Sequence, residues 1–333
     1  MHEQQEPRIR VLSGIQPSGS LHLGNYLGAL RNWVREQHRY DGFFCVVDLH
    51  RLTVPHDPST QRAKNREVAG LYLAAGIDPA LSTVFIQSQV PAHSELAWIL
   101  SCVTPMGWLG RMTQFKEKST DRKDLSSAGL FTYPVLMAAD IVIYEAKLVP
   151  VGDDQKQHLE LCRDIAQSFN HRFGEVLTIP EPLIEKAGAR IMSLSDPTRK
   201  MSKSDENASA CIALLDPPKV IEKKFSRATT DSLTEIRFDK ERHGVHNLLS
   251  IYQVLTGESE QAIEAHFEGK LYGHLKKEVA GRVIEALEPL QARYHALQAD
   301  PGYIEGVLTE GAERARAVAE VTMKRVHDAV GLG

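Results

Sequence analysis

The segment from residue 14 to residue 25 reads GIQPSGSLHLGN and joins a short apolar run to the first helical pattern of the chain. Its small residues allow a ligand to approach the backbone, and the N–H groups at the start of a helix attract an anion. His22 and Asn25 add side-chain donors three residues apart, on one side of the first turn. The pattern predicts a nucleotide phosphate site, although a simple Gly-Pro turn between strand and helix has a similar sequence.

Around this segment, β-branched runs alternate with helical periodicity, which is typical of a parallel sheet wrapped by helices. We predict strands at residues 8–15, 43–48, 83–87, 148–151 and 190–194. One helix follows His22, with an apolar stripe that includes Leu23 and Leu27, and a second spans residues 62–75 and ends at Gly76. Right-handed crossovers place the C-terminal ends of all strands at one edge of the sheet, where ligands of such folds bind. The expected fold class is α/β, with a Rossmann-like parallel sheet.

The second half of the chain has a different pattern. After about residue 205 the strand patterns fade, and long amphipathic stretches dominate at residues 272–298 and 304–330. The run Asp216-Pro217-Pro218 is typical of a helix start. We therefore expect a Rossmann-like domain at residues 1–204, an all-helical domain at 205–299 and a further C-terminal helix at 300–333.

The composition is that of an ordinary globular protein, with 333 residues of which 42% are hydrophobic and 25% charged. A net charge of -4 does not by itself indicate nucleic-acid binding, so any RNA contact must come from local patches. No run is long and apolar enough to cross a bilayer, and the start has no secretory pattern, so we expect a cytoplasmic protein without a membrane partner. The spacing of Cys45, Cys102, Cys162 and Cys211 excludes close metal or redox motifs and favours buried thiols.

A second candidate segment lies in a polar stretch after the last predicted strand. It consists of Lys200-Met201-Ser202-Lys203-Ser204. Two ammonium groups on such a loop can reach phosphates and neutralise the charge that develops as pyrophosphate leaves. Two lysines at this spacing are common, so a solvated loop is the simpler interpretation of the segment in isolation.

A third candidate segment spans residues 133–141. We place Pro134 in the first turn of a helix, on which Tyr133, Met137 and Asp140 fall at i, i+4 and i+7 and share one face. An aromatic ring, a thioether and one carboxylate could form an apolar slot with a single acceptor, which suits indole with its one N–H donor. The alternative is that Tyr133 and Met137 belong to the core and Asp140 is a surface or capping carboxylate.

Together, the first two segments resemble the HIGH and KMSKS signatures of class I aminoacyl-tRNA synthetases, with Asn25 where the first motif ends in histidine. The segments 14–19, 112–118, 133–141, 151–158 and 311–333 resemble the bacterial tryptophanyl-tRNA synthetases, and the likeness covers nearly the whole chain. It implies that the carboxylate of L-tryptophan attacks the α-phosphate of ATP, without a covalent catalyst, before transfer to tRNA(Trp).

The resemblance implies a role for each residue of the tryptophan pocket. Asp140 would accept the indole N–H, and Gln155 would meet the amino or carboxylate end of the substrate. The walls of the pocket would be Tyr133, Met137, Val149 and Val151. Leu12 departs from the aromatic residue that some relatives have near this pocket, and His50, His93 and His158 are interpreted as structural.

For ATP, the resemblance implies a second group of residues. The adenosine and phosphates would be held by Gln16, Pro17, Ser18, Gly24, Asn25 and Ile191, and the ribose by Gly152, Asp153 and Asp154. The catalytic residues would be His22, Asn25, Lys200, Lys203 and Ser204, with Met201 and Ser202 in the same phosphate loop. Lys118 is a further candidate for a phosphate contact, although a solvated charged face explains a lone lysine equally well. Asp153 and Asp154 could instead bind a metal, but we expect no metal site in the protein, because Mg²⁺ is carried by the phosphates of ATP.

The resemblance also implies partners for the rest of the chain. Residues 205–299 would recognise the tRNA anticodon, residues 300–333 would pack on the catalytic domain, and residues 105–140 would form a homodimer surface. Residues 219–242 contain seven Lys or Arg against five Asp or Glu, a bias that a solvated helix face explains equally well. The alternatives are a tyrosyl-tRNA synthetase, a non-catalytic paralogue that binds RNA or tryptophan, and a small-molecule adenylyl or nucleotidyl transferase.

Overall fold

The protein is built on a five-stranded parallel sheet with helices on both faces. The structure is a computed structural model, and it describes residues 8–113, 127–152, 155–183, 190–202, 207 and 209–333. The strands are β1 (Ile9–Ile15), β2 (Tyr40–Val46), β3 (Thr83–Ile86), β4 (Leu148–Pro150) and β5 (Glu181–Leu183). Their order in the sheet is β3-β2-β1-β4-β5, and every pairing is parallel. The predicted α/β class with a Rossmann-like sheet is confirmed.

Four of the five predicted strands are present, and the fifth prediction is wrong. The edge strand is β5 (Glu181–Leu183), whereas residues 190–194 form no strand and make only an isolated bridge between Met192 and Lys200. The backbone N–H and C=O of Met192 are bonded to the side-chain amide of Asn247, at 2.9 and 3.0 Å. The apolar pattern at 190–194 is real, but it packs against the helical part of the chain and not in the sheet.

The helices that follow the strands are short at the start of the chain and longer later. They are α1 (Leu23–Asn25), the π-helix η1 (Tyr26–Leu30), α2 (Arg31–Glu36), α3 (Asp48–Arg51), α4 (Pro58–Ala75), η2 (Gln87–Gln89), α5 (Ala92–Ser101), α6 (Met106–Leu109), α8 (Ala128–Val142) and α9 (Lys156–Phe173). The predicted helix end at Gly76 is confirmed, because this residue adopts φ 113°, a conformation that favours glycine.

The sheet separates two apolar cores. Along β2, Phe44 and Val46 face the core that includes α4, while Phe43 and Cys45 face the core of α5, α8 and α9. The first of these cores continues without interruption into the C-terminal helices, where it includes Phe225 and Leu287. The two cores are therefore the two sides of one sheet, and one of them is shared by the Rossmann-like and the helical regions.

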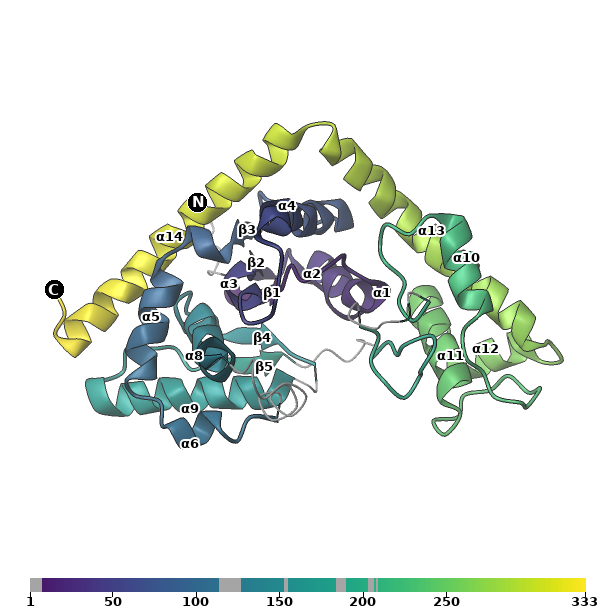
Figure 1. Cartoon of the computed structure of the whole chain (residues 1–333), viewed down its shortest axis with the longest axis horizontal. Coiled ribbons are helices and arrows are strands. Elements are labelled where there is room, and N and C mark those ends of the chain that lie inside the picture. The colour runs from purple at the N-terminus through teal and green to yellow at the C-terminus, as the bar shows by residue number, and fades with distance from the viewer. Residues whose placement is uncertain (1–7, 114–126, 153–154, 184–189, 203–206, 208) are drawn as a thin grey trace, which may run out of the picture.

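The C-terminal part is helical. It consists of α10 (Pro218–Ser226), α11 (His243–Thr256), α12 (Glu260–Phe267), α13 (Tyr272–Gln298) and α14 (Pro301–Val330). The two last helices form an inverted V over the molecule (Figure 1), in which α13 contacts α10, α11 and α4, and α14 contacts β3, α4 and α5. The chain thus returns from the helical region to the outer edge of the sheet.

Two further predictions concern membranes and thiols. Within the ranges that the structure describes, no helix is long and apolar enough to span a bilayer. Cys45 and Cys162 are buried as expected, but Cys102 is exposed and Cys211 is half-buried. The prediction of buried thiols therefore holds for two of the four cysteines. Cys102 is exposed because it directly follows the last turn of α5, where the chain turns at the surface.

Candidate functional site

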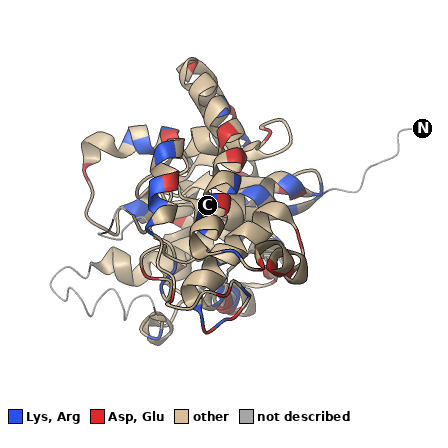
Figure 2. Ribbon diagram, turned by 90° about the vertical axis from the view of Figure 1, so that its right-hand side faces the viewer, with Lys and Arg blue, Asp and Glu red and all other residues tan. Residues whose placement is uncertain are grey.

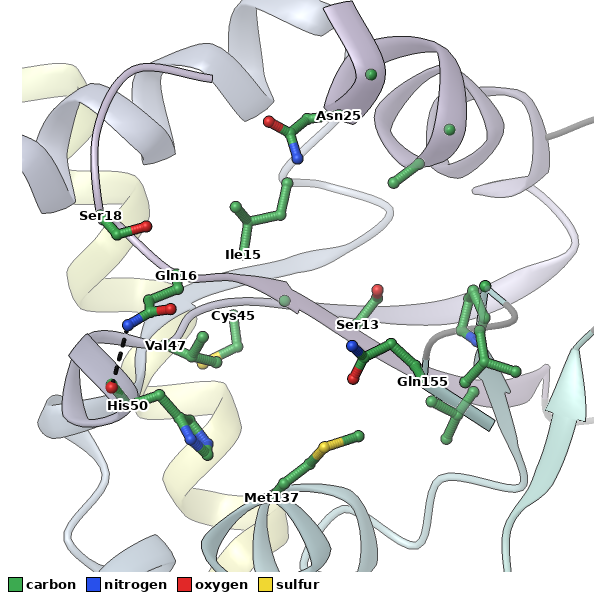
Figure 3. Close-up of a pocket in the computed structure, with 18 of the residues that line it drawn as sticks. Ser13, Ile15, Gln16, Ser18, Asn25, Cys45, Val47, His50, Met137 and Gln155 are labelled. Carbon is green, nitrogen blue, oxygen red and sulfur yellow. Dashed lines mark hydrogen bonds between the residues drawn. The ribbon is translucent and has the colours of Figure 1, made fainter. Parts of the chain in front are cut away.

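A cavity of about 940 Å³ opens at the C-terminal edge of the sheet. Its walls come from the segment after β1, from α3, from α8, from the turn after β4 and from residues 190–191 and 200–202. Figure 3 shows Asn25 on one wall and His50, Met137 and Gln155 on others, all directed toward the same space. The opening motif and the described part of the lysine-containing segment, which are far apart in sequence, therefore line one cavity.

The turn after β1 is shaped by a close backbone approach. A Cβ atom at Gly14 would lie 2.8 Å from the carbonyl oxygen of Cys45, so only glycine fits there. Gly19 adopts φ 145°, which again favours glycine. At the start of α1, the backbone N–H of His22 donates to Oδ1 of Asn25 at 3.1 Å. Asn25 thus fixes the first turn of the helix while it lines the cavity.

The adjoining residues have different exposures. Gln16 and Ser18 line the cavity, and Nε2 of Gln16 donates to the backbone carbonyl of His50 at 3.1 Å (Figure 3). Pro17 is buried in the turn and is not among the described lining residues. His22, which is 6% exposed, lines the cavity together with Gly24, where a Cβ atom would lie 3.0 Å from the His22 ring.

The face of α8 supplies the opposite wall. Tyr133, Met137 and Asp140 all line the cavity, as expected for one helix face. The placement of Pro134 in the first helical turn is wrong, since α8 begins at Ala128 and is capped by Ser127, whose side chain accepts from Leu130 N. The Tyr133 hydroxyl lies 2.6 Å from Nε2 of His158, and burial raises the pKa of Tyr133 to about 12.

Asp140 is 4% exposed, and its carboxylate is held by three side chains. His93 Nδ1 lies 2.6 Å from Oδ1, His50 Nε2 lies 2.8 Å from Oδ2, and Gln87 Nε2 lies 2.7 and 2.9 Å from the two oxygens. Burial by itself would raise the pKa of Asp140, but hydrogen bonds and charge interactions with the two histidines lower it to about 2. The cavity therefore presents an ionised acceptor in an otherwise apolar wall.

These three partners are what the sequence interpretation missed. It treated His50 and His93 as structural and did not consider Gln87, whereas all three contact Asp140 and His50 also lines the cavity. The sequence positions of two of them, each at or just after the end of a predicted strand, could have indicated that they lie at the site. His50 lies just beyond the end of β2 and Gln87 directly follows β3, so both lie at the C-terminal edge of the sheet.

The remaining predicted residues divide into two sets. The cavity is lined by Val149, Val151, Gly152, Gln155, Ile191, Lys200, Met201 and Ser202. Leu12 also lines it. Lys118, Asp153, Asp154, Lys203 and Ser204 lie outside the described residues. Met201 N donates to Ile191 O at 3.0 Å, a bond that joins residues 190–191 to the lysine-containing segment.

The chemistry of this cavity follows from its two ends. One end combines an ionised carboxylate with the aromatic and thioether walls of α8, which suits a flat apolar body with one N–H donor. The other end has glycine-rich backbone, the first turn of a helix and the ammonium of Lys200, which suit a phosphate. Among the described residues, no group of three or more His, Cys, Asp or Glu could hold a metal ion.

Comparisons with known sequences and structures agree on one family of proteins. The model of the family described as "tRNA synthetases class I (W and Y)" matches residues 4–288. The chain is 55% identical to the tryptophan–tRNA ligase of Gloeobacter violaceus over 97% of this chain and 96% of that protein. The tryptophanyl-tRNA synthetase of Mycoplasma pneumoniae is similar in structure, with a TM-score of 0.90, 38% identity and 98% coverage of both chains.

A second solved structure contains ligands. It is the tryptophanyl-tRNA synthetase of Campylobacter jejuni complexed with ADP and tryptophan, with a TM-score of 0.82 and 36% identity. The match covers 97% of this chain and 100% of that chain.

Proposed function

This chain belongs to the class I tRNA synthetases of the tryptophan and tyrosine family, and on that premise we propose how its cavity carries out the reaction. Its activity is that of a tryptophan–tRNA ligase. L-tryptophan and ATP form tryptophanyl-adenylate and pyrophosphate, and the tryptophan is then transferred to the 3′ end of tRNA(Trp). The proposal for the site depends on one observation: the opening motif, Lys200 and Asp140 line the same cavity.

Tryptophan would lie against α8 with its indole N–H directed at Asp140. The carboxylate is buried and ionised, so a ligand that supplies a donor is favoured over one that lacks it. Sites built to hydrogen-bond a donor of the substrate reject analogues without that donor by roughly 10⁴-fold. Tyr133, Met137, Val149 and Val151 would enclose the ring. Gln155, on the adjoining wall, would bind the amino or carboxylate end (Figure 3).

ATP would occupy the end of the cavity formed by the opening motif. Gln16, Ser18, Gly24 and Asn25 would surround the adenosine and phosphates, with Pro17 shaping the turn, and Ile191 would flank the adenine. Gly152 with Asp153 and Asp154 would hold the ribose. ATP would bring its Mg²⁺ bound to the phosphates.

The chemical step is a displacement at phosphorus. An oxygen of the tryptophan carboxylate bonds to the α-phosphorus while the bond to the bridging oxygen of pyrophosphate breaks. Lys200 and Lys203 would neutralise the charge that develops on the leaving group, with Met201, Ser202 and Ser204 in the same loop and His22 and Asn25 in the opening motif. In the second step a ribose hydroxyl of the tRNA attacks the carbonyl carbon, and AMP leaves.

The tRNA would contact the helical region at residues 205–299. Lys219 and Lys223 of α10 are exposed, while Lys224 is paired with Asp216 at 2.6 Å. Figure 2 shows Lys and Arg interspersed with Asp and Glu, so the electrostatic attraction would come from local clusters. We propose further that the enzyme is a cytoplasmic homodimer, with residues 105–140 at the subunit surface and residues 300–333 on the catalytic domain.

Tryptophan-dependent exchange of pyrophosphate into ATP tests this function. We expect rapid exchange with tryptophan and little with tyrosine. Asp140→Ala should lower kcat/KM for tryptophan by roughly 100-fold or more. Asp328→Ala, an exposed carboxylate near the end of α14, serves as the control and should leave exchange unchanged. Comparable rates with tryptophan and tyrosine would contradict the substrate assignment.

The alternative functions have less support. The tyrosyl alternative is set aside because relatives more than half identical to this chain are tryptophan–tRNA ligases. A non-catalytic paralogue would have no need for Lys200 in the cavity beside the opening motif. A small-molecule adenylyl transferase would not use the helical region that follows residue 205. If the protein showed no tryptophan-dependent exchange of pyrophosphate, the non-catalytic paralogue and the small-molecule adenylyl transferase would have to be considered again.

A further inference from the structure

A chain of hydrogen bonds continues from Asp140 into the core behind the cavity wall. His93 contacts Asp140 Oδ1 with Nδ1 and the hydroxyl of Tyr144 with Nε2, at 2.6 and 2.7 Å. Both His93 and Tyr144 are 0% exposed. Neither belongs to the described residues that line the cavity, so neither can touch a ligand there.

The rings of this chain are held firmly. The Tyr144 ring packs against Phe43 and Phe85, with centroid distances of 4.9 and 5.4 Å, and Phe85 also stacks on His93 at 6.1 Å. The backbone carbonyl of Tyr144 accepts a hydrogen bond from Arg10 at 2.7 Å. Packing and hydrogen bonding together fix where the Tyr144 hydroxyl lies, and through it the plane of the His93 ring.

The direction of each hydrogen bond follows from the carboxylate. An ionised carboxylate only accepts, so Nδ1 of His93 and Nε2 of His50 must both donate to Asp140. Burial raises the pKa of Tyr144 well above its usual range, which keeps the phenol protonated. The Tyr144 hydroxyl can therefore donate to Nε2 of His93, and this leaves Nδ1 as the protonated nitrogen.

The two oxygens of Asp140 thus have different surroundings. Oδ1 is tied to His93, behind the wall, whereas Oδ2 is bonded to His50, which lines the cavity. A carboxylate free to rotate about its last bond would present neither oxygen in a fixed direction. Gln87 bonds to both oxygens, and the bond from His93 adds a buried anchor at Oδ1 alone, so that Oδ2 remains the oxygen next to His50.

We propose that His93 and Tyr144 are positioning residues for substrate selection, which hold the Asp140 carboxylate so that Oδ2 is aimed at the N–H of the bound indole. This inference rests on the proposed function, in which Asp140 accepts that N–H. The two residues act through Asp140 and contact neither tryptophan nor ATP. Their contribution is to discrimination between aromatic ligands with and without a correctly placed donor.

The test uses two amino acids, tryptophan and its analogue in which sulfur replaces the indole N–H. The analogue makes no hydrogen bond to Asp140, so its kcat/KM does not depend on the aim of the carboxylate. We expect Tyr144→Phe to raise the KM for tryptophan about tenfold, to change the KM for ATP less than twofold, and to lower the tryptophan-to-analogue ratio of kcat/KM about tenfold. Pyrophosphate exchange measures all three.

A matched control removes a hydroxyl of another buried tyrosine. Tyr252 of α11 is 2% exposed and lies in the helical region, where it packs against Phe267. Tyr252→Phe should leave the ratio unchanged. A purely structural role for Tyr144 would reduce the folded fraction and lower kcat/KM equally for both amino acids, so an unchanged ratio in Tyr144→Phe would overturn the inference.

A pair of variants at His93 gives an independent readout. His93→Asn keeps an N–H near the position of Nδ1, while His93→Leu removes it. We expect the asparagine variant to retain more of the tryptophan-to-analogue ratio than the leucine variant, and equal ratios would count against the positioning role. If the wild-type enzyme itself did not distinguish tryptophan from the sulfur analogue, both the inference and the proposed role of Asp140 would fail.

Discussion

Gly311 of α14 lies directly against the backbone of Val84 in β3. A Cβ atom at Gly311 would lie 1.8 Å from the carbonyl oxygen of Val84, a distance that no packed side chain can adopt. The contact brings the C-terminal helix onto the outermost strand of the sheet, 227 positions earlier in the chain (311 − 84). The absence of a side chain at one residue thus sets how closely the last helix approaches the sheet.

Replacement of Gly311 by alanine should therefore destabilise the protein. We expect Gly311→Ala to lower the free energy of unfolding by at least about 3 kcal/mol, because α14 must move away from β3. Gly306 lies in the same helix with nothing within 4 Å, so Gly306→Ala should stabilise the protein by up to about 1 kcal/mol. Urea unfolding measures both, and equal effects would refute the packing argument.

The stability of the protein should depend on the charge of Asp140. Its pKa of about 2 in the folded chain lies below the usual 3.8, so the carboxylate contributes stability above about pH 4 and loses it as the pH falls toward 2. Asp140→Asn should cost about 2 kcal/mol at pH 7. The difference in unfolding free energy between wild type and variant should shrink as the pH is lowered from 5 to 3. A constant difference would argue against an ionised carboxylate.

Removal of the Lys200 ammonium should affect the reaction more than substrate binding. We expect Lys200→Ala to lower the kcat of tryptophan activation by roughly 100-fold and to change the KM for tryptophan less than threefold, because in the proposed mechanism the charge acts on the departing pyrophosphate. Lys324→Ala, an exposed lysine of α14, is the control. Burst kinetics of adenylate formation separate the chemical step from tryptophan binding. If kcat and the KM for tryptophan changed in proportion, Lys200 would be excluded from the chemical step.

The exposed lysines of α10 should act on tRNA alone. Lys219→Ala and Lys223→Ala should each raise the KM for tRNA roughly two- to fivefold and weaken its salt dependence, while pyrophosphate exchange stays unchanged. Aminoacylation measured at several salt concentrations shows this directly. Loss of exchange in either variant would mean that α10 supports the cavity and does not bind tRNA.

Much of the fold could be read from local patterns. The boundaries of α13, at Tyr272 and Gln298, coincide with the predicted ones, and four strands lie where the β-branched runs place them. Residues 190–194 show the limit. Their apolar residues have the same pattern whether they join a sheet or pack on helices, and the bonds between the Met192 backbone and the amide of Asn247, 55 positions later, cannot be seen in that pattern.

The amino-acid sequence by itself determined the chemistry that is available: a glycine-rich turn before a helix, a lysine-containing segment, and an aromatic, a thioether and a carboxylate on one helical face. These are local properties, because periodicity and residue type depend on neighbours a few positions away. Only the tertiary structure decided that Asp140 is met by His50, Gln87 and His93. Those contacts join elements 47 to 90 positions apart, and the ionisation of a buried carboxylate depends on what surrounds it in space.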